Sequence, residues 1–173
     1  MAKSEETSVN RKSEIISAAI EVFAEIGYYR ATTAQVATRA KISQPYIFRF
    51  FSTKEALLLA ALEVSWTRVI DSFRKVVEYA APEQLETDLI QAYDDILNAF
   101  QNEILLQMQA QTIQEDSIRE AMRNGFGEVR RMVIDAFRAA GIPNPEERTM
   151  LFLARGMLCN ISIALNMPEL KER

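Results

Sequence analysis

Residues 33–51 have the sequence TAQVATRAKISQPYIFRFF, and this stretch decides the fold. A helix-turn-helix needs small or apolar side chains at the inward positions, where its two short helices touch. When Thr33 is counted as the first position, every inward position holds an apolar residue, namely Val36, Ala37, Ala40, Ile42, Ile47 and Phe50. The other positions are largely polar or basic, so the spacing predicts a helix-turn-helix.

The turn of this motif departs from the usual pattern at Lys41. Glycine is usual at this point because the backbone there tends to be left-handed. A non-glycine residue in that conformation costs roughly 1 kcal/mol, which a folded domain tolerates. We therefore expect a left-handed Lys41 that also adds a positive charge near the DNA phosphates.

Caps and apolar periodicity place further helices around the motif. Apolar residues recur every three or four positions over residues 11–26, and a glycine follows directly. Thr32 or Thr33 offers a hydroxyl N-cap for the first short helix of the motif, and Ser43 offers one for the second. The S-x-x-E spacing of residues 52–55 predicts a capping box at the start of a long helix.

The remainder of the chain also has helical periodicity, and no run of residues has convincing strand character. Helices are predicted over 53–79, 82–102, 104–113, 116–140 and 145–166, with Asn144 as the cap of the last. The sequence thus predicts an all-α protein, in which an N-terminal three-helix domain of residues 1–53 joins a larger helical-bundle domain of residues 54–173.

Composition narrows the classes of function. The 173 residues include one cysteine, Cys159, and no histidine, which argues against a metal site and a histidine general base. We expect no cofactor, and we expect no enzyme because no nucleophile–base pair or phosphate-binding glycine loop is visible. Residues 1–10 lack the apolar core of a signal peptide. With a lone cysteine, this indicates a reducing compartment, the cytoplasm.

The distribution of charge points to nucleic acid, although the net charge is −4. Residues 1–54 carry eight basic and five acidic side chains, whereas the rest of the chain carries twelve basic and nineteen acidic ones. No acidic residue lies between Glu25 and Glu55. A basic patch has many causes, but this one coincides with the predicted helix-turn-helix.

The second helix of the motif, predicted over residues 44–50, is the one that enters the DNA major groove. The amide of Gln44 can pair with adenine, Arg49 with guanine or a phosphate, and Pro45 and Tyr46 with thymine methyls or sugars. Hydroxyls and an ammonium group supply contacts to the DNA backbone. The predicted DNA-contacting residues are Thr33, Arg39, Lys41, Ser43, Gln44, Pro45, Tyr46, Arg49, Phe50 and Lys54.

Core packing is the alternative role for the aromatic and apolar residues of this helix. We expect it for Ile47, Phe48 and Phe51, and for about half of the Phe50 side chain, since one short helix cannot bury so many aromatic rings. The remaining ring surface should face outward.

The N-terminal third resembles the TetR family of bacterial transcriptional regulators. The resemblance rests on the landmarks Phe23-x-x-x-Gly27-Tyr28, Thr32-Thr33, Val36-Ala37-x-x-Ala40 and Lys54-Glu55 in this order. It implies a homodimeric repressor with an N-terminal DNA-binding domain and a helical effector-binding domain, which is released from a palindromic operator by a small molecule. Beyond about Leu58, only the lengths and order of the helices agree.

Two departures from the family pattern affect the expected contacts with DNA. Many relatives have a phosphate-binding tyrosine where this chain has Phe48, so that hydroxyl contact is absent. Pro45 occupies a position that is often glycine, and it stiffens the start of the helix.

The last predicted helix indicates dimerisation. From Met150 to Met167, thirteen of eighteen residues are apolar and Arg155 is the only charged one. A helix that is apolar all round is buried on more than one side, so one side should face a second copy of the chain. A membrane span is the alternative, and we expect no membrane association. The predicted interface residues are Met150, Leu153, Met157, Leu158, Ile161 and Leu165.

Aromatic and methionine residues from several helices are candidates for the lining of an apolar effector pocket. Ordinary core packing is the alternative for each of them. The candidates are Trp66, Phe73, Tyr93, Phe100, Met108, Met122 and Phe126. A helical protein-interaction module that does not bind DNA is the remaining alternative for the whole chain. Activation in place of repression stays open, as do the operator and the effector.

Overall fold

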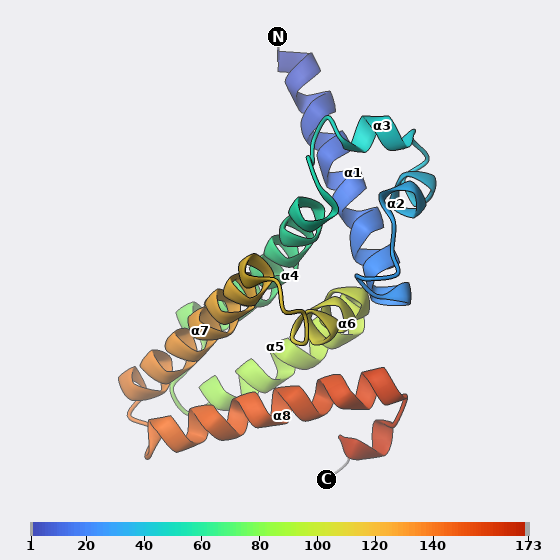
Figure 1. Cartoon of the computed structure of the whole chain (residues 1–173). Helices are drawn as coiled ribbons and strands as arrows, with labels where there is room; N and C mark the ends of the chain where they lie inside the picture. Colours follow the sequence, from blue (N-terminus) through green and yellow to red (C-terminus); the bar gives the residue numbers. More distant parts are fainter. Residues whose placement is uncertain (1, 172–173) are drawn as a thin grey trace. The chain divides into compact units, whose positions relative to one another are not determined.

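The computed structural model describes residues 2–171, with side chains from Val9 onward, and these residues contain helices and no strand (Figure 1). This confirms the all-α prediction. The helices are α1 (Ala2–Ile26), α2 (Thr33–Arg39), α3 (Gln44–Ile47), α4 (Lys54–Tyr79), α5 (Leu85–Ala99), α6 (Gln101–Ala110), α7 (Asp116–Ala139) and α8 (Pro145–Leu165), followed by the short 3-10 helix η1 (Pro168–Leu170).

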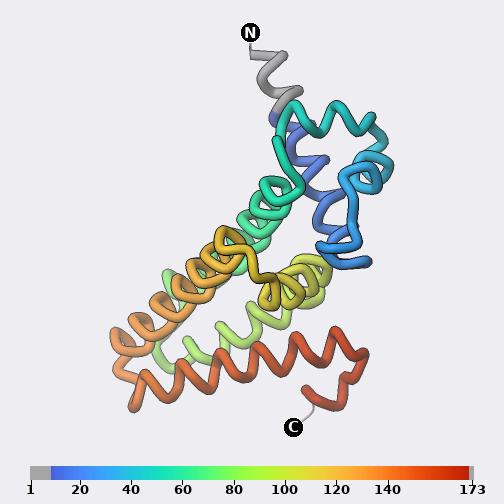
Figure 2. The backbone as a smooth tube through the Cα atoms, viewed as in Figure 1, coloured from blue at the N-terminus to red at the C-terminus, as the bar shows by residue number. Residues whose placement is uncertain are grey.

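The chain divides into two compact units. The first contains the residues up to Val64 together with Leu106–Met122, and the second contains Ser65–Leu105 and the residues from Arg123 onward. Helices α4, α6 and α7 each contribute residues to both units. Figure 2 shows each of these helices as an unbroken tube. That residues 1–53 form a domain of their own remains a prediction.

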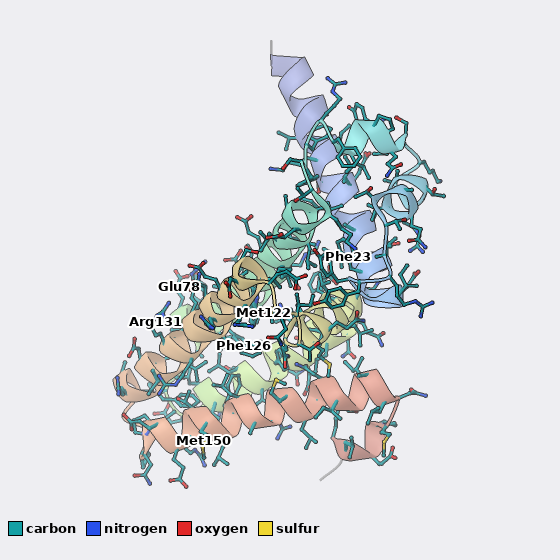
Figure 3. The ribbon with its side chains drawn as sticks, in the orientation of Figure 1. Phe23, Glu78, Met122, Phe126, Arg131 and Met150 are labelled. Atoms are coloured by element: carbon teal, nitrogen blue, oxygen red, sulfur yellow. The ribbon has the colours of Figure 1, made fainter. Side chains whose placement is uncertain are left out.

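The first unit is built around the apolar face of α1. Ile15, Ala19 and Phe23 on that face are almost completely buried, and Phe23 is labelled in Figure 3. Helix α2 packs on α1, and α3 packs on α2. Gly27 ends α1 with φ +79°, which confirms the predicted C-terminal cap, because L residues rarely adopt this conformation.

Several predicted helix boundaries were wrong. Helix α1 begins at Ala2, since the polar residues before Arg11 continue the helix without adding to its apolar stripe. Helix α5 ends at Ala99 because Phe100 leaves helical geometry (φ −133°, ψ 47°), and α6 begins directly after it. The boundary between the predicted helices 82–102 and 104–113 therefore lies at Phe100 rather than at residue 103.

Two of the predicted caps also differ. Thr53, rather than Ser52, caps α4 by accepting a hydrogen bond from the amide of Ala56 at 2.9 Å. Glu55, the expected partner in the capping box, accepts a hydrogen bond from Ser117 Oγ instead. At the start of α8, Asn144 is left-handed (φ 52°) and its side chain makes no capping bond.

In the second unit, α8 packs against α5. Their contact includes a hydrogen bond of 2.7 Å from Tyr93 Oη to Oδ1 of the buried Asn160. Burial raises the pKa of Tyr93 to about 12. Gly156 faces the ring of Tyr93, and a Cβ atom at that position would lie 3.3 Å from its Cε1 atom. Small size at this position therefore lets the two helices approach each other closely.

Candidate nucleic-acid interface

The α2–turn–α3 segment has the geometry of a helix-turn-helix. Thr32 caps α2 through a reciprocal pair of bonds with Gln35: the Gln35 amide donates to Thr32 Oγ1 at 3.2 Å, and the Thr32 amide donates to Gln35 Oε1 at 2.9 Å. Lys41 lies in the left-handed region (φ 56°), as predicted. The amide of Ile42 then donates to the carbonyl of Ala37 at 3.0 Å and closes the turn.

Helix α3 is shorter than predicted. It begins after Ser43, whose backbone is extended (φ −79°, ψ 147°) and whose hydroxyl makes no capping bond. The helix ends at Ile47, and the amides of Phe50 and Phe51 both donate to the Ile47 carbonyl, at 2.9 and 3.0 Å. Residues 48–50 therefore form turns rather than a further turn of α-helix.

The side chains of this segment divide between core and solvent. Ile47 and Phe51 are buried and Phe50 is half-buried, as predicted, but Phe48 is 50% exposed rather than buried. The prediction failed because it extended α3 to Phe50, whereas the helix stops before Phe48. Sequence reasoning thus missed Phe48 as a surface residue available to DNA.

The predicted base-reading side chains are exposed and have defined neighbours. Gln44, Pro45 and Arg49 are exposed, and the guanidinium of Arg49 lies 5.1 Å from the centre of the Tyr46 ring. The Tyr46 ring in turn packs edge-on against Phe50 at 5.4 Å. Stacking of this kind holds a cation in place while its N–H groups remain free to donate. Lys41 and Ser43 are exposed immediately before this group.

Thr33 and Gln44 are brought together across the two helices. Gln44 Nε2 donates to Thr33 Oγ1 at 2.8 Å, and Thr33 is 9% exposed. The sequence predicted both residues as DNA contacts but gave no sign that they touch.

Lys54 is engaged within the protein. Its Nζ atom donates to the carbonyls of Tyr28 and Ala31, at 2.9 and 3.0 Å, and lies 4.5 Å from the centre of the Tyr28 ring. These contacts fasten the connector between α1 and α2 to the start of α4. The phosphate contact predicted for Lys54 stays a prediction, and the ammonium would have to leave these carbonyls to make it.

Arg39 is paired with two carboxylates of α1. Its guanidinium donates to Glu25 at 2.7 and 2.9 Å and to Glu21 at 2.7 Å. The hydrogen bonds to Glu25 and then Glu21 raise the pKa of Arg39, and the same pairing lowers the pKa of Glu25. The acid-free sequence around Arg39 concealed this arrangement, because its partners come from the preceding helix.

The predicted effector-pocket residues are distributed over both units. Met108 and Met122 belong to the first unit, and the other five belong to the second. Within the second unit, Trp66 packs on Phe126 at 4.9 Å and Phe73 packs on Tyr93 at 5.9 Å. The guanidinium of Arg68 covers the ring of Phe100 at 4.6 Å. These contacts are those of a packed core, and a cavity of about 10 Å³ lies beside Tyr93.

Helix α8 exposes most of the predicted dimer residues. Met150 and Leu165 are 60% and 61% exposed, and Leu158 and Ile161 are also exposed, while Leu153 and Met157 are half-buried. The Met150 side chain is labelled on α8 in Figure 3. Leu151 is exposed as well and was missed. Among the described residues, α8 is also the one helix that could cross a membrane by length and composition.

The α2–turn–α3 geometry agrees with a comparison to known families. Residues 15–61 match the family model described as bacterial regulatory proteins, tetR family. Residues 15–61 of the chain belong to the TetR family. The match covers the second half of α1, the helix-turn-helix and the first turns of α4, which is the part of the chain that carried the resemblance in the sequence.

The curated relatives of this chain include two named regulators. The HTH-type transcriptional regulator HbdR of Aromatoleum sp. strain CIB is 27% identical over 134 residues, which cover 75% of this chain and 57% of that protein. The HTH-type transcriptional activator FasR of Mycolicibacterium smegmatis is 33% identical over 67 residues, which cover 39% of this chain and 31% of that protein. The chain thus spans less than two thirds of the length of these relatives.

Similarity in three dimensions extends over nearly the whole chain. The regulator FadR from Bacillus subtilis, solved in complex with stearoyl-CoA, superposes with a TM-score of 0.76 at 15% identity and covers 89% of this chain and 88% of its own. At this identity the likeness establishes the fold: a TetR-like arrangement with an N-terminal helix-turn-helix and a helical C-terminal region.

Proposed function

We propose that this regulator is a homodimeric repressor that reads a palindromic operator with α3 and is released by an apolar effector. The observation that carries the proposal is the exposed group formed by Gln44, Pro45 and Arg49 on α3 and the turn after it, held above the buried Ile47. Such a group matches the size and hydrogen-bonding pattern of base edges in the major groove. Phe48, which is exposed beside it, supplies apolar contact to the sugars. We further propose that the protein acts in the cytoplasm.

A salt series tests the DNA-binding part of this proposal. Fluorescence anisotropy with a labelled random-sequence duplex should show an affinity that falls steeply as the salt concentration rises. In a plot of the logarithm of the association constant against the logarithm of the salt concentration, each contacted phosphate should add about −0.9 to the slope. Arg49→Ala should weaken binding. Lys75→Ala, at an exposed lysine of α4 in the second unit, is the matched control and should not. Affinity that ignores salt would contradict DNA binding by this surface.

Dimerisation is proposed through a stripe on α8. The exposed residues Leu151, Ala154, Leu158, Ile161 and Leu165 recur at alternating intervals of three and four, which is the spacing of the apolar seam in a helix pair. The opposite side of the helix packs inside its own unit through Phe152, Cys159 and Asn160. A second copy of the same helix has the matching spacing, so we propose that α8 pairs with its twin.

Sedimentation equilibrium tests this pairing. Leu158→Lys places a charge in the middle of the stripe and should convert a dimer to a monomer, and DNA affinity should fall with it. Glu83→Lys changes an exposed residue outside α8 and should leave the dimer intact. A dimer that survives Leu158→Lys would show that the pairing surface lies elsewhere.

The second unit is the proposed effector site. Trp66 is buried, and its Nε1 atom has no hydrogen-bond partner among the described residues. An orphaned buried donor is costly, about 1–3 kcal/mol, and an effector with an acceptor atom would satisfy it. The FadR complex with stearoyl-CoA supports a long-chain acyl thioester as the first class to test. The cavity beside Tyr93 is small, so binding must separate core side chains.

Because Trp66 is the single tryptophan, its fluorescence reports directly on such binding. We expect palmitoyl-CoA to change that fluorescence and to release DNA, and coenzyme A without an acyl chain to do neither. In a transcription assay the effector should then raise transcript levels. A fall would instead favour activation, the role in the name of FasR.

A further inference from the structure

The neighbouring residues Thr32 and Thr33 have different hydrogen-bonding roles. Thr32 is the N-cap of α2 and exchanges hydrogen bonds with Gln35. The hydroxyl of Thr33 is therefore not needed as a cap, and it accepts the 2.8 Å bond from Gln44 Nε2. Since Thr33 is nine-tenths buried, this acceptor is fixed in position by the packing of α2.

Gln44 is held at both its backbone and its amide. The extended Ser43 before it and the ring of Pro45 after it fix its backbone at the first position of α3. A free glutamine has three side-chain torsions to order on binding, and ordering them costs conformational entropy. The bond to Thr33 orders them before DNA arrives.

The bond also sets which edge of the amide faces outward. A carboxamide nitrogen carries two protons, one on the same side as the oxygen and one on the opposite side. When Thr33 takes the proton on the far side, the outward edge presents Oε1 beside the remaining N–H. This acceptor–donor pair complements N6–H and N7 of adenine. The same pair disfavours guanine, because the guanine O6 acceptor would face the amide oxygen. A glutamine held in this way also cannot rotate to donate both of its amide protons to guanine.

We propose that Thr33 is a positioning residue that fixes the Gln44 amide so that it selects adenine over guanine at one base pair of each half-site. This deepens the proposed function, because it requires that α3 lies in the major groove. It also differs from a direct contact between Thr33 and a phosphate, since such a contact would strengthen binding to every sequence alike.

The test measures base preference, rather than affinity alone, on duplexes that carry each of the four bases at each position of a selected site. Gln44→Ala first identifies the position that Gln44 reads, where the wild type should prefer adenine over guanine by roughly 5- to 150-fold. Thr33→Val, which keeps the shape and removes the hydroxyl, should lower that ratio by roughly fivefold or more at the same position only. Thr33→Ser retains the hydroxyl and should restore the ratio.

Thr32→Val is the matched control at the neighbouring threonine. It should lower the thermal stability of the protein by loss of the cap without changing the adenine-to-guanine ratio. A Thr33→Val protein that binds all duplexes more weakly with an unchanged ratio would overturn the proposal and assign Thr33 to a phosphate. A wild type without any base preference would instead contradict the reading of DNA by α3, and this failure is distinguishable from the first.

Discussion

Substitution of Gly125 tests the packing of the second unit, because two glycines of α7 offer a matched pair. A Cβ atom added at Gly125 would lie 2.6 Å from Trp66 Cγ and closer still to Cδ2 and Cε2. At Gly127 the nearest atom is Arg131 Nη1, at the end of a long side chain, at 3.4 Å. Both residues are inside α7, so alanine gains about 1 kcal/mol of helix propensity at each.

The two variants should therefore move stability in opposite directions. Overpacking against a buried ring costs about 1–3 kcal/mol, so Gly125→Ala should lose up to about 2 kcal/mol after the propensity gain, whereas Gly127→Ala should gain about 0.5–1 kcal/mol. For a chain of this length, 1 kcal/mol shifts Tm by roughly 2–4 °C. Urea denaturation followed by Trp66 fluorescence and by circular dichroism measures both variants.

A rescue experiment separates steric overlap from other causes. Trp66→Leu removes the ring that Gly125 faces, so in that background the cost of Gly125→Ala should disappear. The coupling energy in this double-mutant cycle should be at least about 1 kcal/mol. Equal stability of the Gly125→Ala and Gly127→Ala proteins would refute the close approach of Trp66 to α7.

Three further predictions concern polar contacts. Burial raises the pKa of Tyr93 to about 12, so the folded state holds this proton more tightly than the unfolded state, and stability should fall as the pH rises from about 10 to 12. In urea denaturation, Tyr93→Phe should make this fall smaller. A pH profile unchanged by the substitution would contradict the role given to Tyr93. Lys54→Met removes the donor to two carbonyls of the α1–α2 connector and should lower the free energy of unfolding by about 1–3 kcal/mol. Unchanged stability, together with a salt dependence of DNA binding that is smaller by about one in logarithmic slope, would assign Lys54 to a phosphate. Glu21→Gln combined with Glu25→Gln frees Arg39, and it should raise the affinity for all duplexes and steepen the salt dependence of binding. Glu147→Gln should do neither. Equal effects of the two changes would show that Arg39 takes no part in DNA binding.

The helix-turn-helix was predictable from sequence because its constraints are local. The left-handed Lys41 and the buried Val36 and Ile47 follow from their positions along nineteen residues of chain. The exposed Phe48 was missed because the predicted end of α3 was wrong. The end of so short a helix depends on a single hydrogen bond, which the sequence pattern does not determine.

Contacts between residues distant in sequence were not predictable. Nothing in the local sequence indicated that the Trp66 ring lies against Gly125. The acid-free segment suggested that Arg39 was free, but its carboxylate partners come from α1. Apolar character alone also did not indicate which side of α8 faces its own unit, which explains the inclusion of the half-buried Leu153 and the omission of the exposed Leu151.

Selection of bound duplexes from a random-sequence library tests the central claim most directly. A dimer that presents α3 twice should enrich a palindromic motif whose half-site centres lie about 10 base pairs, or a multiple of this, apart. Each half-site should contain an adenine whose enrichment disappears in the Gln44→Ala protein. A single unrepeated motif, or no enrichment over the input library, would contradict the claim that the protein reads DNA as a dimer through α3.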